Sequence, residues 1–200
     1  MYKKYLAELV GTFALSFVVL SAVASGGGLP IAVPLIAALT LGLFVYTIGP
    51  VSGCHINPAV TLGLLSIKKI SSIEAVRYIL AQLLGALAAI LVSKIFVITS
   101  PMTASPFNSR VFLAEGLGTF FFCFGIASVV YGQAKEQMSG LVIGGSLLLG
   151  VLIASLVGAA GILNPAVAFA LNSATILYTV APVVGSVLGF KTYKYIVNVQ

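Results

Sequence analysis

The chain has 200 residues, of which 60% are hydrophobic and 7% are charged, with 10 Lys or Arg residues, 4 Glu and no Asp. A soluble domain carries about 25% charged residues because its surface faces water. This composition excludes a soluble globular enzyme and indicates an integral membrane protein whose surroundings are a lipid bilayer. The net charge of +6 is spread along the chain, so we expect no nucleic-acid partner.

Six apolar segments are each long enough to cross a bilayer, which takes about 20 residues. They cover approximately residues 5–25, 31–49, 73–98, 109–131, 138–158 and 175–197. The first resembles a signal peptide, but it contains Glu8 and lacks a convincing cleavage site, so we interpret it as a retained span. The sequence predicts an all-α membrane protein with six transmembrane helices in a single transmembrane domain, residues 1–200.

Two further apolar stretches, residues 57–66 and 164–172, are too short to cross a membrane, and both begin with Asn-Pro-Ala. A short helix at membrane depth is tolerated only where protein or a water-filled cavity surrounds it. We therefore predict two re-entrant half-helices.

The chain contains an internal repeat. Ala-Glu-x-x-Gly-Thr-Phe occurs around Glu8 and again around Glu115, and Asn-Pro-Ala-Val begins at Asn57 and again at Asn164. Both pairs are separated by 107 residues. The halves, about 1–98 and 108–200, each hold three spans and one half-helix. An odd number of spans makes the second half enter from the opposite side, which predicts two inverted repeats.

The basic residues predict the orientation, because Lys and Arg concentrate in cytoplasmic loops. With a cytoplasmic N-terminus and six crossings, eight of the ten fall inside, and Lys94 and Arg110 fall outside. We expect both termini in the cytoplasm. The short loops favour a prokaryotic plasma membrane. The eight residues expected inside are Lys3, Lys4, Lys68, Lys69, Arg77, Lys135, Lys191 and Lys194.

The paired Asn-Pro-Ala motifs carry the chemistry. Asn is a strong N-cap and Pro suits the first helical position, so each half-helix should begin at its motif. Each N-terminus bears about +0.5 of an elementary charge, and each Asn amide offers N–H donors to a passing oxygen. Such a pair hydrogen-bonds neutral solutes and repels cations. The six motif residues are Asn57, Pro58, Ala59, Asn164, Pro165 and Ala166.

The residues around these motifs resemble those of a known family. Residues 52–61, Ser-Gly-Cys-His-Ile-Asn-Pro-Ala-Val-Thr, closely resemble the first signature loop of the aquaporin (major intrinsic protein) family. Ala-Glu-x-x-Gly-Thr-Phe in spans one and four, residues 82–85 in span three and residues 182–185 in span six are similar to that family too. The resemblance implies a passive channel for water and small neutral solutes, without a cofactor, that assembles as a homotetramer.

One position departs from the family, in which Arg follows the second Asn-Pro-Ala as part of an outer selectivity filter. Here that residue is Val167. The resemblance places the other filter positions at Leu152, Gly161 and Ala37, with Leu41 as the alternative to Ala37 after a one-turn shift. Such a filter is wide and apolar, and it implies solutes larger than water, such as glycerol, urea, ammonia or metalloid acids.

Several alternatives stay open. Glu8 and Glu115 either accept hydrogen bonds from the loops behind the half-helices or relay protons in a proton-coupled secondary carrier. A third possibility is a non-conducting scaffold of the same fold. His55 lines the cytoplasmic vestibule, holds its loop or senses pH, and Cys54 is a candidate for mercurial block. With a single His and two unpaired cysteines, we expect no metal site. The sequence shows no nucleophile–base pair, so we do not expect an enzyme.

Overall fold

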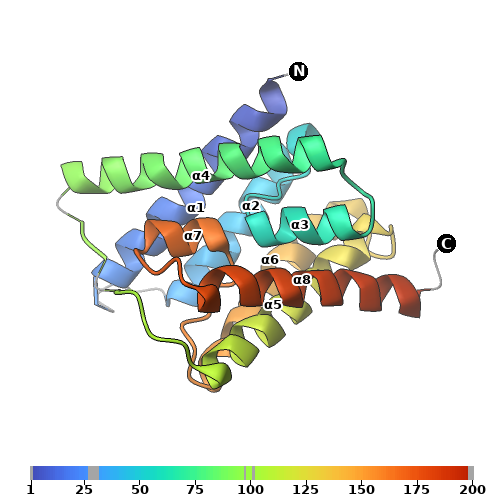
Figure 1. Ribbon diagram of the computed structural model, residues 1–200. Helices are drawn as coiled ribbons and strands as arrows, with labels where there is room; N and C mark the ends of the chain where they lie inside the picture. Colours follow the sequence, from blue (N-terminus) through green and yellow to red (C-terminus); the bar gives the residue numbers. More distant parts are fainter. Residues whose placement is uncertain (1, 27–31, 97, 101, 198–200) are drawn as a thin grey trace.

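A computed structural model describes residues 2–26, 32–96, 98–100 and 102–197. Six of its helices are long and apolar enough to cross a membrane, and two are short (Figure 1). The long helices are α1 (Lys3–Ala24), α2 (Val33–Ser52), α4 (Ser72–Ile95), α5 (Ser109–Val130), α6 (Ser139–Leu156) and α8 (Ile176–Ile196). The short helices are α3 (Pro58–Ser66) and α7 (Pro165–Ala170), and a 3-10 turn, η1 (Glu136–Met138), precedes α6.

These bounds confirm the predicted elements, with ends that differ by up to about three residues, and the end of α2 is the instructive difference. The sequence placed the end of this span before Pro50, but the helix continues to Ser52. Proline lacks an N–H donor and so removes one helical hydrogen bond, a small loss in the last turn. The helix ends instead at Gly53, whose φ of 84° is left-handed and whose N–H donates to the Gly49 carbonyl at 2.8 Å. Glycine adopts this conformation without steric cost.

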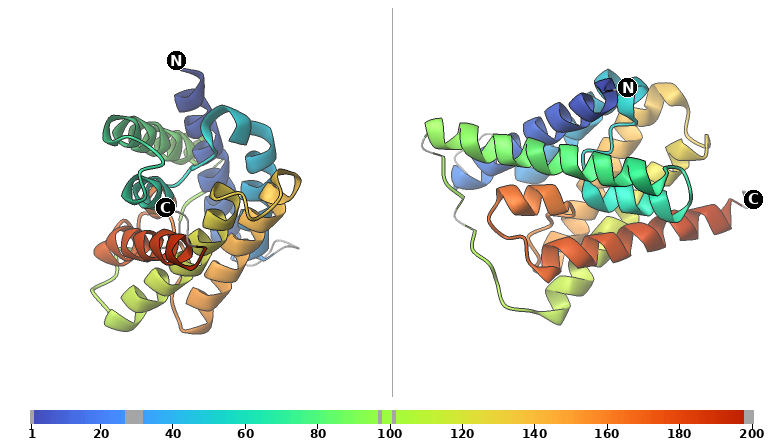
Figure 2. Two further views of the ribbon diagram at one scale, coloured as in Figure 1. Left: turned by 90° about the vertical axis from the view of Figure 1, so that its right-hand side faces the viewer. Right: turned by 45° about the horizontal axis from the view of Figure 1, so that its top comes forward.

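The two halves repeat one arrangement of helices. In the first half α1 packs against α2 and α4, and in the second half α5 packs against α6 and α8. The short helices cross between halves, since α3 packs on α8 and α7 packs on α4. Figure 1 shows α3 and α7 end to end between α4 and α8, and Figure 2 shows the same order from two other directions. This is the inverted-repeat architecture predicted from the sequence.

Small residues allow the long helices to approach closely. A Cβ atom on Gly185 of α8 would overlap the Gly116 carbonyl oxygen of α5, and one on Gly85 of α4 would overlap the Leu9 carbonyl oxygen of α1. Small residues at contacts are the usual means by which helices associate in a bilayer. Leucines such as Leu39, Leu80 and Leu149 instead project outward and are exposed, as expected for side chains that face lipid.

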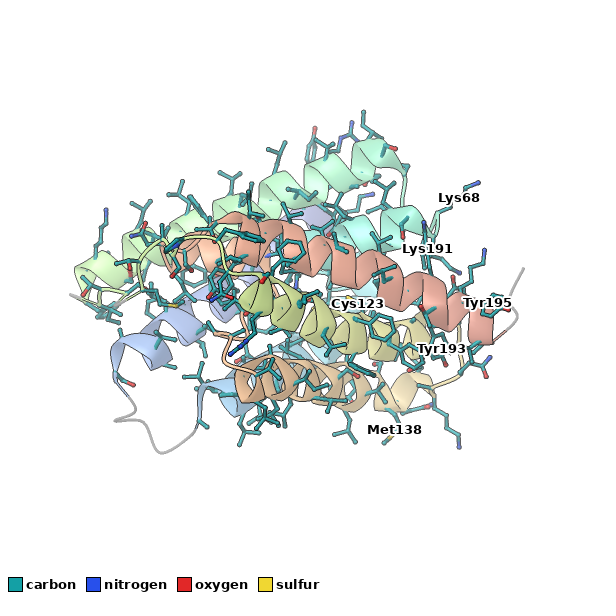
Figure 3. All side chains as sticks on the ribbon, turned by 60° about the horizontal axis from the view of Figure 1, so that its bottom comes forward. Lys68, Cys123, Met138, Lys191, Tyr193 and Tyr195 are labelled. Carbon is teal, nitrogen blue, oxygen red and sulfur yellow. The ribbon has the colours of Figure 1, made fainter. Side chains whose placement is uncertain are left out.

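Charged side chains gather at one end of the bundle. Lys68 and Lys191 lie there together with Tyr195 (Figure 3). Glu74 joins the start of α1 to the start of α4, because it contacts Lys4 and accepts a hydrogen bond from Tyr5 at 2.8 Å. The sequence assigns these basic residues to the cytoplasmic side, and that orientation stays a prediction.

Candidate functional site

The N-termini of α3 and α7 meet in the middle of the protein. Asn57 caps α3, with its Oδ1 accepting from the Ala59 N–H at 2.8 Å. Asn164 caps α7, with its Oδ1 accepting from the N–H groups of Ala166 at 3.0 Å and Val167 at 3.4 Å. Each Asn precedes the Pro that begins its helix. Both caps therefore form as the motif predicted, and they satisfy N–H groups that a helix start leaves without partners.

Each Asn side chain also binds the opposite loop, which the sequence did not predict. Asn57 Nδ2 donates to the Leu163 carbonyl at 2.9 Å, and Asn164 Nδ2 donates to the Ile56 carbonyl at 3.0 Å. A primary amide has two N–H donors. The reciprocal bonds use one donor of each amide, fix the orientation of both, and leave the second donor of each for a solute. Both Asn residues border the same cavity.

The loops before the two helices have an unusual backbone. Cys54, Ile56 and Leu163 adopt positive φ angles of 50°, 36° and 53°, which are costly for residues with a side chain. In this conformation the carbonyl groups of Ile56 and Leu163 accept hydrogen bonds from the two Asn amides. Strain of this kind persists only where the surroundings hold it in place.

Glu8 holds the first loop. Its two carboxylate oxygens accept from the backbone N–H groups of His55 at 2.9 Å and Ile56 at 2.7 Å. They also accept from the Ser52 hydroxyl at 2.7 Å and the Gln82 amide at 2.8 Å. Four donors converge on one fully buried carboxylate, so the loop between α2 and α3 is tied to both α1 and α4.

Glu115 holds the second loop, which precedes α7, by accepting hydrogen bonds from the backbone of that loop. It accepts from the N–H groups of Gly161 at 2.7 Å, Ile162 at 3.2 Å and Leu163 at 3.0 Å. Glu115 is also fully buried. Two cavities flank Asn57 and Asn164, the Asn pair, and among the described residues neither Glu8 nor Glu115 borders either cavity. This is the geometry expected of a support for the loop backbone.

A cavity of about 310 Å³ extends from the Asn pair toward the side that the sequence places outside, and we call it the outer cavity. Of the expected filter residues, Gly161, Val167 and Ala37 border it, and so does the alternative Leu41. Among the described residues no Lys, Arg, Asp or Glu lines this cavity. The wall formed by these residues is therefore apolar apart from a few hydrogen-bonding groups.

The expectation for Leu152 is wrong. Its side chain is 43% exposed and does not border the outer cavity, whereas Val151 does and is 6% exposed. The position was counted back from Asn164 through an irregular loop in which Gly158 and Gly161 have positive φ angles. One residue of error rotates a helical side chain by about 100°, since a turn takes 3.6 residues. The count could therefore identify the turn of α6 but not its face.

A second cavity of about 450 Å³, the inner cavity, lies on the opposite side of the Asn pair and is bordered by Cys54 and His55. Cys54 is 5% exposed. His55 Nδ1 lies 3.1 Å from Thr61 Oγ1, and its ring centre is 4.8 Å from that of Tyr78.

Sequence reasoning missed the roles of three side chains near the site: Gln82, Val151 and Phe122. Gln82 is fully buried in α4 and bridges Glu8 and Thr61, and a polar residue inside a span is a signal that could have identified it. Phe122 borders both cavities. Nothing in the sequence distinguishes it from the two phenylalanines before it.

Comparisons with known proteins agree with this geometry. The family model for major intrinsic proteins matches residues 1–193. The chain is 33% identical to aquaporin AqpM of Methanothermobacter thermautotrophicus, over 98% of each chain. It is 35% identical to glycerol uptake facilitator protein-like 6 of Lactiplantibacillus plantarum, over 93% of this chain and 94% of the relative.

A solved structure shares the fold. The aquaglyceroporin from Plasmodium falciparum superposes with a TM-score of 0.74 at 23% identity, covering 98% of this chain and 96% of that one. The family match, the sequence relatives and the shared six-helix fold lead to one conclusion. The chain belongs to the major intrinsic protein family of passive membrane channels, and it is not an enzyme.

Proposed function

We propose that the chain is a passive channel for water and small neutral solutes, with a pore that runs through the outer cavity, past the Asn pair and into the inner cavity. The observation that carries this proposal is the reciprocal geometry of Asn57 and Asn164. Both amides border one cavity at the junction of two helix N-termini, and each keeps one N–H donor that bonds to none of the described residues.

The same geometry supports exclusion of cations. The N-termini of α3 and α7 point at one another, and each carries about half a positive elementary charge. A neutral molecule meets hydrogen-bond donors there, whereas a cation meets a positive potential. With Val167 at the position of the family's Arg, this barrier rests on Asn57, Asn164 and the helix ends alone.

The apolar wall of the outer cavity supports a wide filter. Val167, Ala37 and Val151 provide neither charge nor side-chain hydrogen bonds at this level. Solutes larger than water then meet no guanidinium in their path, so we propose glycerol, urea, ammonia or metalloid acids as substrates beside water. One relative is named a glycerol uptake facilitator and another an aquaporin, which supports a pore of this range.

The test is stopped-flow light scattering on liposomes that contain the purified protein. We expect water and glycerol to pass faster than through empty liposomes, and proton flux to stay at the level of empty liposomes. Fast water with excluded glycerol would contradict the wide filter. No solute flux at all would favour a non-conducting scaffold, and saturable uptake driven by a pH gradient would favour a proton-coupled carrier.

A pair of matched variants separates the pore from general stability. Asn57→Ala removes a helix cap and a solute donor, whereas Asn108→Ala removes only a cap, because Asn108 is exposed and its Oδ1 accepts from the Arg110 N–H at the start of α5. We expect Asn108→Ala to lose the roughly 1 kcal/mol of a cap. Asn57→Ala should lose the cap and also leave the buried Leu163 carbonyl without its donor, at about 1–3 kcal/mol more. Only Asn57→Ala should change water flux or proton leak.

The surroundings of the channel are also proposals. We propose a homotetramer with one pore in each subunit and cytoplasmic termini in a prokaryotic plasma membrane. The gathering of Lys68 and Lys191 at one end of the bundle supports the orientation. Cross-linking in native membranes and protease access to tagged termini test these points.

A further inference from the structure

The inner and outer cavities are separate but share three wall residues, Leu41, His55 and Phe122. A side chain that borders both cavities lies at the boundary between them. Asn57 and Asn164 border only the outer cavity, so this boundary lies on the inner side of the Asn pair. A solute that has passed both amides must still cross it.

Two of the three residues form an apolar side of the boundary. Leu41 of α2 and Phe122 of α5 are each 2% exposed, and they come from opposite halves of the repeat. Ala37, one turn before Leu41, borders the outer cavity alone. The outer end of α2 thus presents a small side chain to the pore, whereas the inner boundary presents a large one.

The third residue, His55, forms a polar side of the boundary, and its ring is held in place by Thr61. Thr61 Oγ1 lies 3.1 Å from the Asn57 carbonyl, to which its hydroxyl donates, and it accepts from Gln82 Nε2 at 3.0 Å. Its contact with His55 Nδ1 at 3.1 Å then needs the hydrogen on the ring nitrogen. This tautomer leaves His55 Nε2, which has no partner among the described residues, as an acceptor.

We infer that solutes are selected by size and shape at the boundary of Leu41, Phe122 and His55 rather than at the outer filter positions. The inference rests on the proposed channel function. A solute fits this boundary when it presents a hydroxyl or N–H edge to His55 and a carbon face to Leu41 and Phe122. The matching class is short linear polyols, with wider solutes excluded by the two apolar side chains.

The experiment measures the permeability of water, glycerol and the four-carbon polyol erythritol in liposomes that contain wild type, Leu41→Ala or Phe122→Ala. The matched controls are Leu39→Ala and Phe121→Ala, whose side chains lie on the same helices but are 58% and 39% exposed. We expect both boundary variants to raise the ratio of erythritol to water permeability about tenfold, which corresponds to a barrier lower by about 1.4 kcal/mol. The controls should match wild type.

A variant in the outer cavity, Val167→Ala, decides whether the boundary or the outer filter limits the passage of large solutes. If the boundary is limiting, this variant leaves the erythritol ratio unchanged. A rise in Val167→Ala with no rise in the boundary variants would overturn the inference and place selection at the outer filter. Wild type that conducts neither water nor glycerol would instead overturn the proposed channel function. Leu41→Val and Phe122→Leu provide smaller changes, with a smaller rise expected, should the Ala variants fail to purify as single species.

Discussion

Replacement of Glu115 by Gln tests whether the buried carboxylates support the structure or move protons. Glu115 accepts three backbone N–H groups, two on Oε1 and one on Oε2. In Glu115→Gln one of these oxygens becomes an NH₂ group that cannot accept. The most favourable orientation keeps the oxygen toward Gly161 and Ile162, and the Leu163 N–H then faces another donor.

The expected loss follows from that single orphaned donor. A buried N–H without a partner costs about 1–3 kcal/mol. The two remaining bonds also weaken, since bonds to a charged acceptor are about twice as strong as neutral ones. Removal of a buried charge offsets this second loss. We therefore expect a net destabilisation of about 1–3 kcal/mol, concentrated in the loop before α7.

The assay is the apparent melting temperature of the detergent-purified protein, together with flux in liposomes. A change of 1 kcal/mol shifts the midpoint by about 2–4 °C for a chain of 150–250 residues, so Glu115→Gln should melt several degrees below wild type. Glu136→Gln is the matched control, because it removes a carboxylate charge from the exposed turn η1 and should leave the melting temperature unchanged.

The flux measurement separates the two roles. A structural carboxylate predicts that folded Glu115→Gln still conducts neutral solutes down their gradients, with no dependence on a proton gradient. The reasoning is refuted if Glu115→Gln melts with wild type while losing a pH-driven uptake that wild type shows. That result would make Glu115 a proton carrier and its three hydrogen bonds incidental to stability.

Three further predictions concern the pore wall and the helix contacts. Val167→Arg should lower the ratio of glycerol to water permeability, because it places a large cation in the apolar outer cavity, and an unchanged ratio in stopped-flow assays would show that residue 167 does not face the path of the solute. Gly185→Ala should lower the melting temperature by an amount matching the 1–3 kcal/mol of overpacking, since its Cβ would overlap Gly116, whereas Gly145→Ala meets open space and should not. A membrane-impermeant mercurial should block flux from the inner side alone through Cys54, which borders the inner cavity, and Cys54→Ser should be resistant.

The sequence predicted the elements of the site because their signals are local or exactly repeated. The spacing between Glu8 and Glu115 matches that between Asn57 and Asn164, so the inverted repeat could be inferred without any contact information. Asn followed by Pro is a helix start in any surroundings, and the structure begins α3 and α7 at those residues. Such features depend on residues that are neighbours in the chain, so they can be predicted without knowledge of the tertiary contacts.

What the sequence could not predict depends on rotation and on partners far apart in the chain. Leu152 and Val151 are adjacent in sequence, and the irregular loop after α6 decides which one faces the pore. The bonds from Asn57 to Leu163 and from Asn164 to Ile56 span more than 100 residues. They require two strained loops to meet with their carbonyls turned inward, and no local pattern records that requirement.

The repeat also explains why the centre of the site is nearly symmetric while its two ends differ. The caps, the crossed amide bonds and the buried carboxylates occur once in each half, and each bond needs its counterpart to hold both loops. A change in one half would leave a buried polar group of the other without a partner, at about 1–3 kcal/mol. Apart from the Asn pair and its loops, the described residues of the cavity walls form no such reciprocal bonds. Val167 could therefore replace a charged residue at the outer end, and Lys69 and Glu136 could border the inner cavity, without disturbing the Asn pair between them.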